Sequence, residues 1–529
     1  MYYLLLSFSA VVLAIHWALS SRRGTSAKLP PGPAPLPLVG NIMDLPVKGE
    51  PEYQHWLKFK DKYGPISSVT VLGQTIVILH DRQAAEEILE KTASKSSGRP
   101  YLTFAAMCGF YNLVGLMGYN PTWRQQRKMI HQQLGTKKTA AQFNDVQDTE
   151  SRRLVLRIIK DPQSLIQHIK IAAAAIILKI TYGYSIHLHQ PDPFVLLIEE
   201  MMDNISRAVV PGAWLVDFVP WIRFLPSWLP GMQFNATAKD WSKITQQVTD
   251  MPYQFVRDQM QKGTHHPSYV SRHIDQATQQ DGAALKIDPD MEEAIKWTAS
   301  VMYSGGADTT VSVISALFLA MIMFPDVQRK AQAEIDTVIG SNRLPELQDQ
   351  DQLPYVSAVV KEALRWFPIT PMGLGHSADE AIPYQGYVIP KGSIIMTATW
   401  WFHNDPQVYL DPSAFDPERF LGPRNEPDPA GTVFGHGRRT CPGKFVADMS
   451  LFWTISRILA VLDIRKAVDE HGVPIEAQRQ FLPGLVAHPA KFAFDISARS
   501  PAHAKLAEEV GINSHLGSSD AEALNFESW

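Results

Sequence analysis

One cysteine in a glycine-flanked loop constrains this chain more than any other feature. The segment FGHGRRTCPG, residues 434–443, places Cys441 between Gly437 and Gly443, just before a predicted helix at residues 446–462. A helix N-terminus and nearby arginines favour the charged form of a thiol, and glycines let the backbone approach both the sulfur and a flat bound group. A lone cysteine cannot form a zinc site, which needs more Cys or His ligands at short spacing. The loop therefore predicts a metal-bound thiolate whose other ligands come from a cofactor.

Composition indicates a large folded protein in a reducing compartment. The chain has 529 residues, of which 45% are hydrophobic and 19% charged, enough to bury a sizeable core. A net charge of -4 gives no reason to expect nucleic acid as a partner. With only two cysteines, Cys108 and Cys441, a disulfide framework is excluded. Cys108 lies in an apolar run without a second ligand, and we expect it to be a buried, inert thiol.

Helical patterns outnumber strands along the chain. Pro325 and Gly340 bracket one helix, and others are predicted at residues 291–324, 353–367 and 446–462. Short β-branched segments, such as residues 76–79, predict small sheets. There is no fixed-period repeat and no internal linker-rich break. We therefore expect a mainly α fold with small β-sheets, as one large domain at residues 42–499 followed by a polar, mobile tail at residues 500–529.

The N-terminus predicts a membrane anchor. Residues 2–19 are mostly apolar, long enough to span a bilayer, and Arg22 and Arg23 follow them. A cleavable signal peptide, the alternative, would carry its positive charge before the apolar run. We assign residues 1–21 to a single-pass anchor and residues 22–41 to a basic, proline-rich spacer, with the rest of the chain on the cytosolic side.

The cysteine loop resembles that of the cytochrome P-450 family. The family pattern F-x-x-G-x-R-x-C-x-G is met at every specified position, by Phe434, Gly437, Arg439, Cys441 and Gly443. The resemblance implies a single cytochrome P-450-type domain that binds haem b, with Cys441 as the axial thiolate ligand of the iron. It also implies that Phe434 packs near the sulfur and that Arg439 pairs with a haem propionate.

Two further motifs belong to the same resemblance. EALR contains Glu362 and Arg365 at i and i+3, a pair that alone indicates a solvated helix surface. The resemblance adds Arg419 from PERF and implies a buried, structural ionic triad. WRQQR contains Trp123 and Arg127 on one helical face, which alone indicates an ordinary amphipathic helix. The resemblance implies that both donate hydrogen bonds to a propionate, and a looser match adds His376 to the cofactor-binding residues.

The segment SGGADTT, residues 304–310, conflicts with the helix that contains it. Two adjacent glycines and an Asp-Thr pair are poor choices for a helix interior, and such conflicts mark functional sites. In the family the corresponding residues lie over the oxygen-binding face of the haem. The resemblance implies that Asp308 and Thr309 are catalytic and deliver protons, while Gly305 and Gly306 make room for dioxygen.

Together these motifs predict a haem-thiolate monooxygenase. We expect it to hydroxylate or epoxidise a lipophilic small molecule with dioxygen and electrons from an NADPH-dependent flavoprotein reductase, at the endoplasmic reticulum membrane. The closest resemblance is to enzymes of mushroom-forming fungi in natural-product pathways, which favours a terpenoid substrate; an aromatic alkaloid or polyketide is the alternative. A haem-thiolate isomerase or dehydratase that needs no reductase, and a haem sensor or carrier, also remain open.

Overall fold

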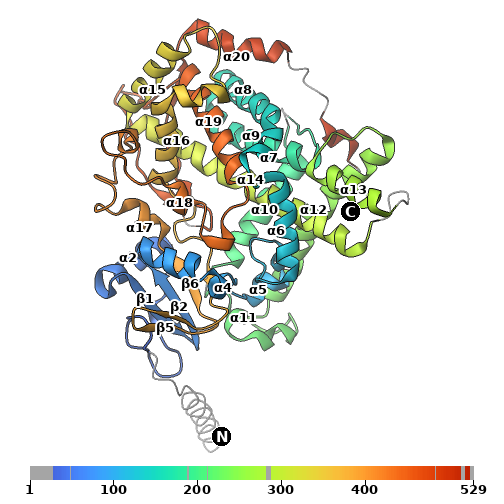
Figure 1. The fold of residues 1–529 in the computed structure, drawn as a ribbon, viewed down its shortest axis with the longest axis vertical. Helices are drawn as coiled ribbons and strands as arrows, with labels where there is room; N and C mark the ends of the chain where they lie inside the picture. Colours follow the sequence, from blue (N-terminus) through green and yellow to red (C-terminus); the bar gives the residue numbers. More distant parts are fainter. Residues whose placement is uncertain are drawn as a thin grey trace, which may run out of the picture.

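A computed structural model describes residues 28–524, apart from residues 48, 188–189, 211, 282–286, 483 and 514–518. The predicted anchor at residues 1–21 therefore lies outside the described residues. Figure 1 shows a large helical body with a small sheet at one end, next to the start of the described chain. The predicted fold class, mainly α with small β-sheets, is confirmed.

The helices and strands have the following bounds. The helices are α2 (Glu52–Tyr63), α3 (Arg82–Ala85), α4 (Ala93–Ser96), α5 (Thr103–Met107), α6 (Pro121–Leu134), α7 (Lys137–Ala140), α8 (Asn144–Lys160), α9 (Leu165–Tyr182), α10 (Pro193–Ala208), α11 (Leu215–Phe218), α12 (Phe234–Lys262), α13 (Tyr269–Asp281), α14 (Pro289–Met323), α15 (Pro325–Val338), α16 (Pro354–Trp366), α17 (Thr399–Asn404), α18 (Ala430–Val433), α19 (Lys444–Val461) and α20 (Pro501–Asn513). The strands are β1 (Ile66–Val71), β2 (Gln74–Leu79), β3 (His376–Ser377), β4 (Ile382–Tyr384), β5 (Tyr387–Ile389), β6 (Ile394–Thr397), β7 (Leu462–Arg465), β8 (Phe481–Leu482), β9 (His488–Pro489) and β10 (Asp495–Ala498).

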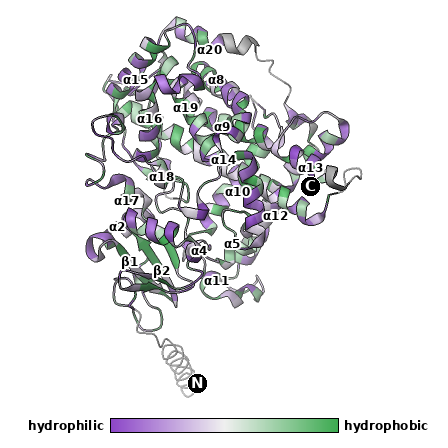
Figure 2. Cartoon of the chain, viewed as in Figure 1, coloured by the Kyte–Doolittle hydropathy of each residue, from purple (hydrophilic) through white to green (hydrophobic). Residues whose placement is uncertain are grey.

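The longest helix, α14, runs through the centre of the body. The Asp288 side chain accepts a hydrogen bond from the Met291 N–H and Pro289 occupies the first turn, so the start of the helix is defined by its sequence. Its second half, from Val311 onward, is buried against α9, α16 and α19. Figure 2 shows hydrophobic residues along α14 and α9 and hydrophilic ones on the outer helices. This core holds α14 rigidly.

The largest sheet has the strand order β1-β2-β6-β3. β1 and β2 form an antiparallel hairpin, β2 pairs with β6 in parallel, and β6 pairs with β3 in antiparallel. The hairpin turns at Leu72 and Gly73, where Gly73 has a φ of 90°, a value that glycine adopts without strain. Two-stranded sheets pair β4 with β5, β7 with β10 and β8 with β9.

The predicted helices and the observed ones agree to within about two residues at each end. The predicted polar tail at residues 500–529 contains a helix in its described part. Residues 501–513 form α20, which packs on α8 and α19 and fully buries Ala507. Further along, the Asp520 carboxylate accepts a hydrogen bond from the Ser185 N–H.

Two helical segments of the described residues, Pro162–Tyr182 and Pro289–Met323, are long and apolar enough to cross a membrane. More than half of each is buried inside the body, so they serve as core helices.

Candidate active site

The cysteine loop connects α18 to α19 in a closed turn. The Cys441 N–H donates to the Phe434 carbonyl at 2.7 Å, which brings the two ends of the motif together. Gly437 has a φ of 55°, and a Cβ atom there would overlap the Leu89 carbonyl oxygen. Only glycine fits this approach. α19 begins three residues after the cysteine, as expected.

The protein alone does not favour a Cys441 thiolate. Burial raises the pKa of the Cys441 thiol, and the Gly443 N–H and the charges of Arg127 and Lys444 offset this only in part. The backbone at the helix start and a nearby arginine thus favour the charged form, as expected, but burial outweighs them in the protein alone. The charge of a bound metal ion is what would stabilise the thiolate.

The polar segment of α14 is more exposed than the apolar residues that follow it. Gly305 is exposed and the residues after it are partly exposed, whereas Val311 and those beyond are buried. The Thr309 hydroxyl donates to the Gly305 carbonyl at 2.8 Å. A Cβ atom at Gly305 would meet nothing within 4 Å, but one at Gly306 would lie 2.8 Å from the Ile177 side chain of α9. Gly305 therefore leaves open space, and Gly306 serves helix packing.

Hydrogen-bond donors gather beside the cysteine loop. Arg439 is buried and donates to the carbonyls of Ser97, Val114 and Met117, and its guanidinium lies 4.4 Å from the Trp123 ring centre. The Trp123 indole shares the Val114 carbonyl, and Arg127 donates to the Thr440 carbonyl next to the cysteine. α6 holds Trp123 and Arg127 in place because Asn120 caps its start.

Arg99 is a member of this cluster that sequence reasoning missed. Its guanidinium is buried and donates to the carbonyls of Gly115, Leu374 and Gly375. Burial and the charge of Arg439 lower the pKa of Arg99. The arginine follows a glycine and precedes a proline at the edge of the apolar run 101–118, a pattern too common to single it out.

The predicted ionic triad forms, with all three side chains fully buried. Arg365 makes a two-pronged contact with Glu362, and Arg419 Nε lies 3.1 Å from Glu362 Oε1. A fourth member, Glu426, accepts from Arg419 at 2.6 Å. Arg365 also donates to the His403 carbonyl, and the His403 ring contacts the Thr432 hydroxyl at 2.8 Å. The triad is thereby connected to α18, directly before the cysteine loop.

Comparison with known proteins decides the family. A sequence model of the cytochrome P-450 family matches residues 30–494. The chain is 47% identical to the cytochrome P-450 monooxygenase CLM2 of Gibberella zeae, covering 94% of each chain. It is 46% identical to the multifunctional cytochrome P-450 monooxygenase af510 of Aspergillus fumigatus, over 92% of this chain and 91% of the relative. It is 41% identical to the cytochrome P-450 monooxygenase claR of Ampulloclitocybe clavipes, over 94% and 91%. The chain belongs to the cytochrome P-450 family.

A P-450 binds haem through a cysteine thiolate, and it is an oxidoreductase that incorporates oxygen from dioxygen. The charges of the donor cluster beside the cysteine loop indicate whether this chain could hold a haem. The charge of Arg439 acts on Arg99, the charge of Arg127 acts on Arg439, and Asp379 is the acid that acts on Arg439. Burial and these neighbours lower the pKa of Arg439 to about 10. Because positive charge is in excess here, the two carboxylates of a haem would compensate it. The residues fit the cofactor.

His376 makes a more conditional contribution than the sequence suggested. Its Nδ1 lies 2.8 Å from the Ser96 carbonyl, so Nδ1 carries the proton. Burial and the charges of Arg99 and Arg439 hold the pKa of His376 well below its usual value. In a neutral ring Nε2 can only accept a hydrogen bond. Donation from Nε2 to a propionate would require the protonated ring, which the propionate charge itself would favour.

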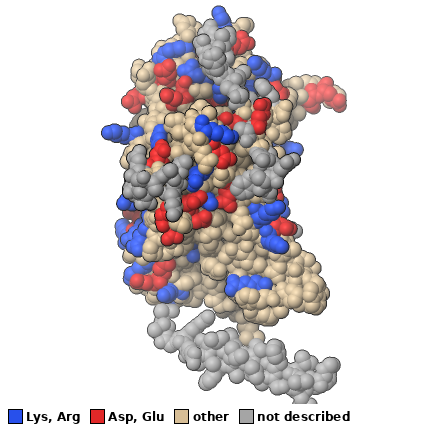
Figure 3. Space-filling view, turned by 90° about the vertical axis from the view of Figure 1, so that its right-hand side faces the viewer, with Lys and Arg blue, Asp and Glu red and all other residues tan. Residues whose placement is uncertain are grey.

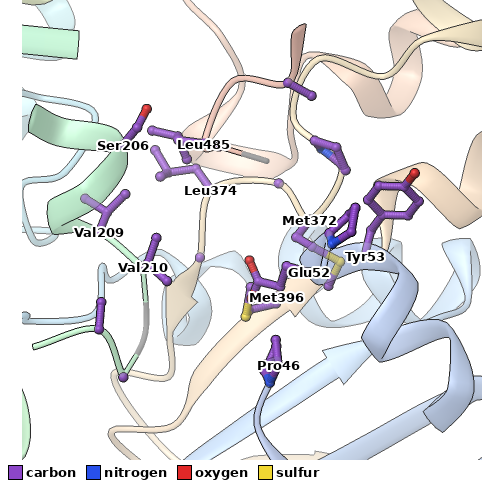
Figure 4. Close-up of a pocket in the computed structure, with 18 of the residues that line it drawn as sticks. Pro46, Glu52, Tyr53, Ser206, Val209, Val210, Met372, Leu374, Met396 and Leu485 are labelled. Atoms are coloured by element: carbon purple, nitrogen blue, oxygen red, sulfur yellow. The ribbon is translucent and has the colours of Figure 1, made fainter. Parts of the chain in front are cut away.

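A large pocket of about 620 Å³ lies between the four-stranded sheet, the loop that follows α10 and the β8–β9 hairpin. Figure 4 shows that apolar side chains such as Val209, Met372, Met396 and Leu485 surround it. Residues from three apolar, glycine-containing segments, 101–118, 369–374 and 481–486, contribute to its lining. Sequence reasoning missed two further parts of the lining, which carry no motif of their own. One is the loop before α2 with the start of that helix, and the other is the end of α10 with the loop after it.

Proposed function

We propose that this P-450 is a monooxygenase in which Cys441 would supply the thiolate ligand of the haem iron. The closed loop, in which Cys441 donates to Phe434 at the start of α19, is the observation that supports this most strongly. When bound, the haem supplies activation of dioxygen and insertion of one oxygen atom into a C–H or C=C bond, with the other oxygen leaving as water. Gly437 sets the loop geometry, and Phe434 and Gly443 flank the sulfur.

Five side chains would hold the haem propionates. Arg439 and Arg99 are fixed by carbonyl groups, Trp123 lies under Arg439, and Arg127 reaches the cysteine loop. His376 joins them as a donor once its ring is protonated. Carboxylates prefer such charge-assisted donors, above all guanidinium groups.

Asp308 and Thr309 are proposed to deliver protons above the haem. The Thr309 hydroxyl can accept a proton from water and pass its own onward, and it is partly exposed beside the open space at Gly305. The triad of Glu362, Arg365 and Arg419 is structural, because it lies away from this space and is fully buried.

The proposed electron donor is an NADPH-dependent flavoprotein reductase. Arg124 and Arg438 both lie against the Tyr119 ring, at 5.9 and 5.1 Å, and Arg438 donates to the Tyr119 hydroxyl. Lys128 is exposed on the same helix as Arg124. This basic group on the cysteine side of the site would suit an acidic surface of the reductase.

We propose that the protein is anchored in the endoplasmic reticulum membrane through residues 1–21, with its body in the cytosol. Exposed apolar side chains occur near the start of the described chain and in the segment after α10. These two segments adjoin, because Leu45 of the first lies against Gly212 of the second. The lower end of the surface in Figure 3 carries few charges. Such a surface would rest on lipid. Its members are Leu36, Leu38, Met43, Val47, Leu215, Trp221, Phe224 and Trp228.

The proposed substrate is a lipophilic carbon skeleton, and we favour a terpenoid over an aromatic alkaloid or polyketide. The apolar pocket of about 620 Å³ supports the lipophilic class and has room for a small polycyclic molecule.

The test is turnover of the purified protein with a flavoprotein reductase, NADPH and isotopically labelled dioxygen against a panel of terpene, alkaloid and polyketide scaffolds. We expect a product that carries one labelled oxygen atom and forms only when NADPH is present. A rearranged or dehydrated product formed without NADPH would replace this proposal with the isomerase or dehydratase. Haem binding without any turnover across the panel would favour a sensor or carrier.

A further inference from the structure

A histidine from the C-terminal hairpin faces the acidic residue of α14. His488 on β9 places its Nε2 3.1 Å from Asp308 Oδ1. Both side chains are about one quarter to one third exposed, at 30% and 26%. Sequence reasoning gave His488 no role, since nothing in its local pattern distinguishes it from a surface histidine.

The contact is held in register by a second link between the same two elements. One helical turn after Asp308, the Ser312 hydroxyl donates to the Ala487 carbonyl at 2.5 Å. The Ala487 N–H in turn donates to the Ile369 carbonyl, so β9 is fixed on both sides. His488 is therefore placed opposite Asp308 by the backbone that precedes it.

These two residues line a separate cavity of about 270 Å³ between α9, α10, α14 and the β8–β9 hairpin. The cavity is charged at its other wall, where Lys170 Nζ lies 3.1 Å from Glu199 Oε1 and both side chains are over one third exposed. Asp203, which pairs with Arg207, also lines it. The cavity thus extends from a solvated ion pair to the carboxylate of Asp308, with room for water.

We propose that His488 is a positioning residue for Asp308, and that the two form the inner end of a water-filled path for protons. This inference rests on the proposed proton-delivery role of Asp308. The close approach of His488 Nε2 to Asp308 Oδ1 fixes the orientation of that carboxylate at the wall of the cavity that both residues line. Without it the carboxylate would rotate among alternative rotamers, and proton delivery would slow.

Proton supply can be measured without knowing the substrate. Two electrons and two protons convert dioxygen into hydrogen peroxide, whereas four electrons and four protons convert it into two water molecules. NADPH provides the electrons through the reductase in both cases. Slow proton delivery favours the first outcome, so the ratio of peroxide to water per dioxygen consumed reports the path.

The experiment compares two substitutions at His488 in the haem-loaded, full-length protein. His488→Phe keeps a ring of similar size but cannot donate, whereas His488→Gln keeps an N–H donor at similar reach. We expect His488→Phe to raise the ratio of peroxide to water roughly fivefold, as for loss of one hydrogen bond, and His488→Gln to restore it. His471→Gln, an exposed histidine far from the cavity, serves as the control. An unchanged ratio in His488→Phe, or equal damage in His488→Gln, would overturn the positioning role.

A spectroscopic measurement separates this inference from the function on which it rests. The protein is labelled with 13C at Cε1 of its histidine rings and studied by NMR in the ferrous carbonyl form, which is diamagnetic. The His488 signal is the one that disappears in His488→Phe. Asp308→Asn should move that signal, whereas Thr310→Ala should not. If Asp308→Asn leaves the peroxide ratio unchanged, the proposed role of Asp308 fails. A different outcome is that Asp308→Asn raises the peroxide ratio, but does not move the His488 signal, and His488→Phe does not raise the ratio. The role of Asp308 would then stand and the inference about His488 would fail.

Discussion

Arg365 and Glu362 are joined by two hydrogen bonds of 2.7 Å each, and neither side chain has exposed surface. A buried ion pair of this kind contributes little beyond a hydrophobic pair, but removal of one partner leaves an uncompensated charge. The arrangement makes the triad a sensitive point for stability.

We therefore predict that Glu362→Gln lowers the free energy of unfolding by about 3–5 kcal/mol, because two buried arginines lose their shared carboxylate. Denaturant unfolding followed by tryptophan fluorescence measures this. Glu418→Gln is the matched control, since Glu418 lies next to Arg419 in the sequence but forms an exposed pair with Lys330. That change should cost less than about 1 kcal/mol. Equal losses in both variants would contradict the structural role of the triad.

Cys441→Ser should abolish the red-shifted Soret band of the reduced protein with carbon monoxide, because that band requires sulfur donation to the iron. Cys108→Ala should retain it. Cys108 is fully buried, and burial raises the pKa of its thiol to about 12, so it is inert. The measurement is the difference spectrum of each variant after haem loading. A shifted band in Cys441→Ser would mean that another residue is the ligand.

Gly437→Ala should weaken haem retention and cost about 2 kcal/mol or more, since it combines a left-handed backbone with overlap at the Leu89 carbonyl. Gly472→Ala is the control, because Gly472 also has a positive φ of 77° but a Cβ atom there would meet nothing within 4 Å. Haem content per protein and the melting temperature of both variants test the comparison. Similar behaviour of the two would show that the approach to Leu89 is not limiting.

Thr309→Ala should keep the haem spectrum and much of the NADPH consumption while diverting electrons from product to hydrogen peroxide. Alanine preserves the helix but removes the hydroxyl that relays protons. Product formed and peroxide released, each per NADPH consumed, are compared with the parent and with Thr310→Ala, which removes a neighbouring hydroxyl. Unchanged coupling in Thr309→Ala would assign proton delivery to another route.

Stability should fall in mild acid. Burial lowers the pKa of His80 to about 4, and its ring contacts the Ser67 hydroxyl. Below pH about 6.5 the unfolded chain binds a proton that the folded state excludes, so stability present at neutral pH is lost as the pH falls toward 4. We expect His80→Gln to remove roughly 2–3 kcal/mol of this loss. Melting temperatures of the parent and the variant, measured from about pH 4.5 to about pH 8, cover the range in which the ring titrates. A parallel curve for parent and variant would exclude His80 as a source.

The sequence predicted the residues that act through motifs, and missed those that act through position. Glu362, Arg365 and Arg419 could be grouped because the family pattern relates them across the chain. Arg99 and His488 carry no such pattern, and only the fold brings them to the donor cluster and to Asp308. The extent of desolvation at Cys441 could not be predicted for the same reason, since it depends on packing that residue spacing does not reveal.

The position of the large pocket has a consequence for how the enzyme selects molecules. Its lining includes Val47 and Val210, from the same loops that carry the exposed apolar residues proposed to rest on lipid. If these residues rest on lipid as proposed, the opening of the pocket faces the bilayer, and the enzyme takes its substrate from the bilayer. The apparent KM would then track the amount of substrate per lipid rather than per volume of buffer. Two molecules that fit the pocket equally well would be separated by how strongly each partitions into the membrane.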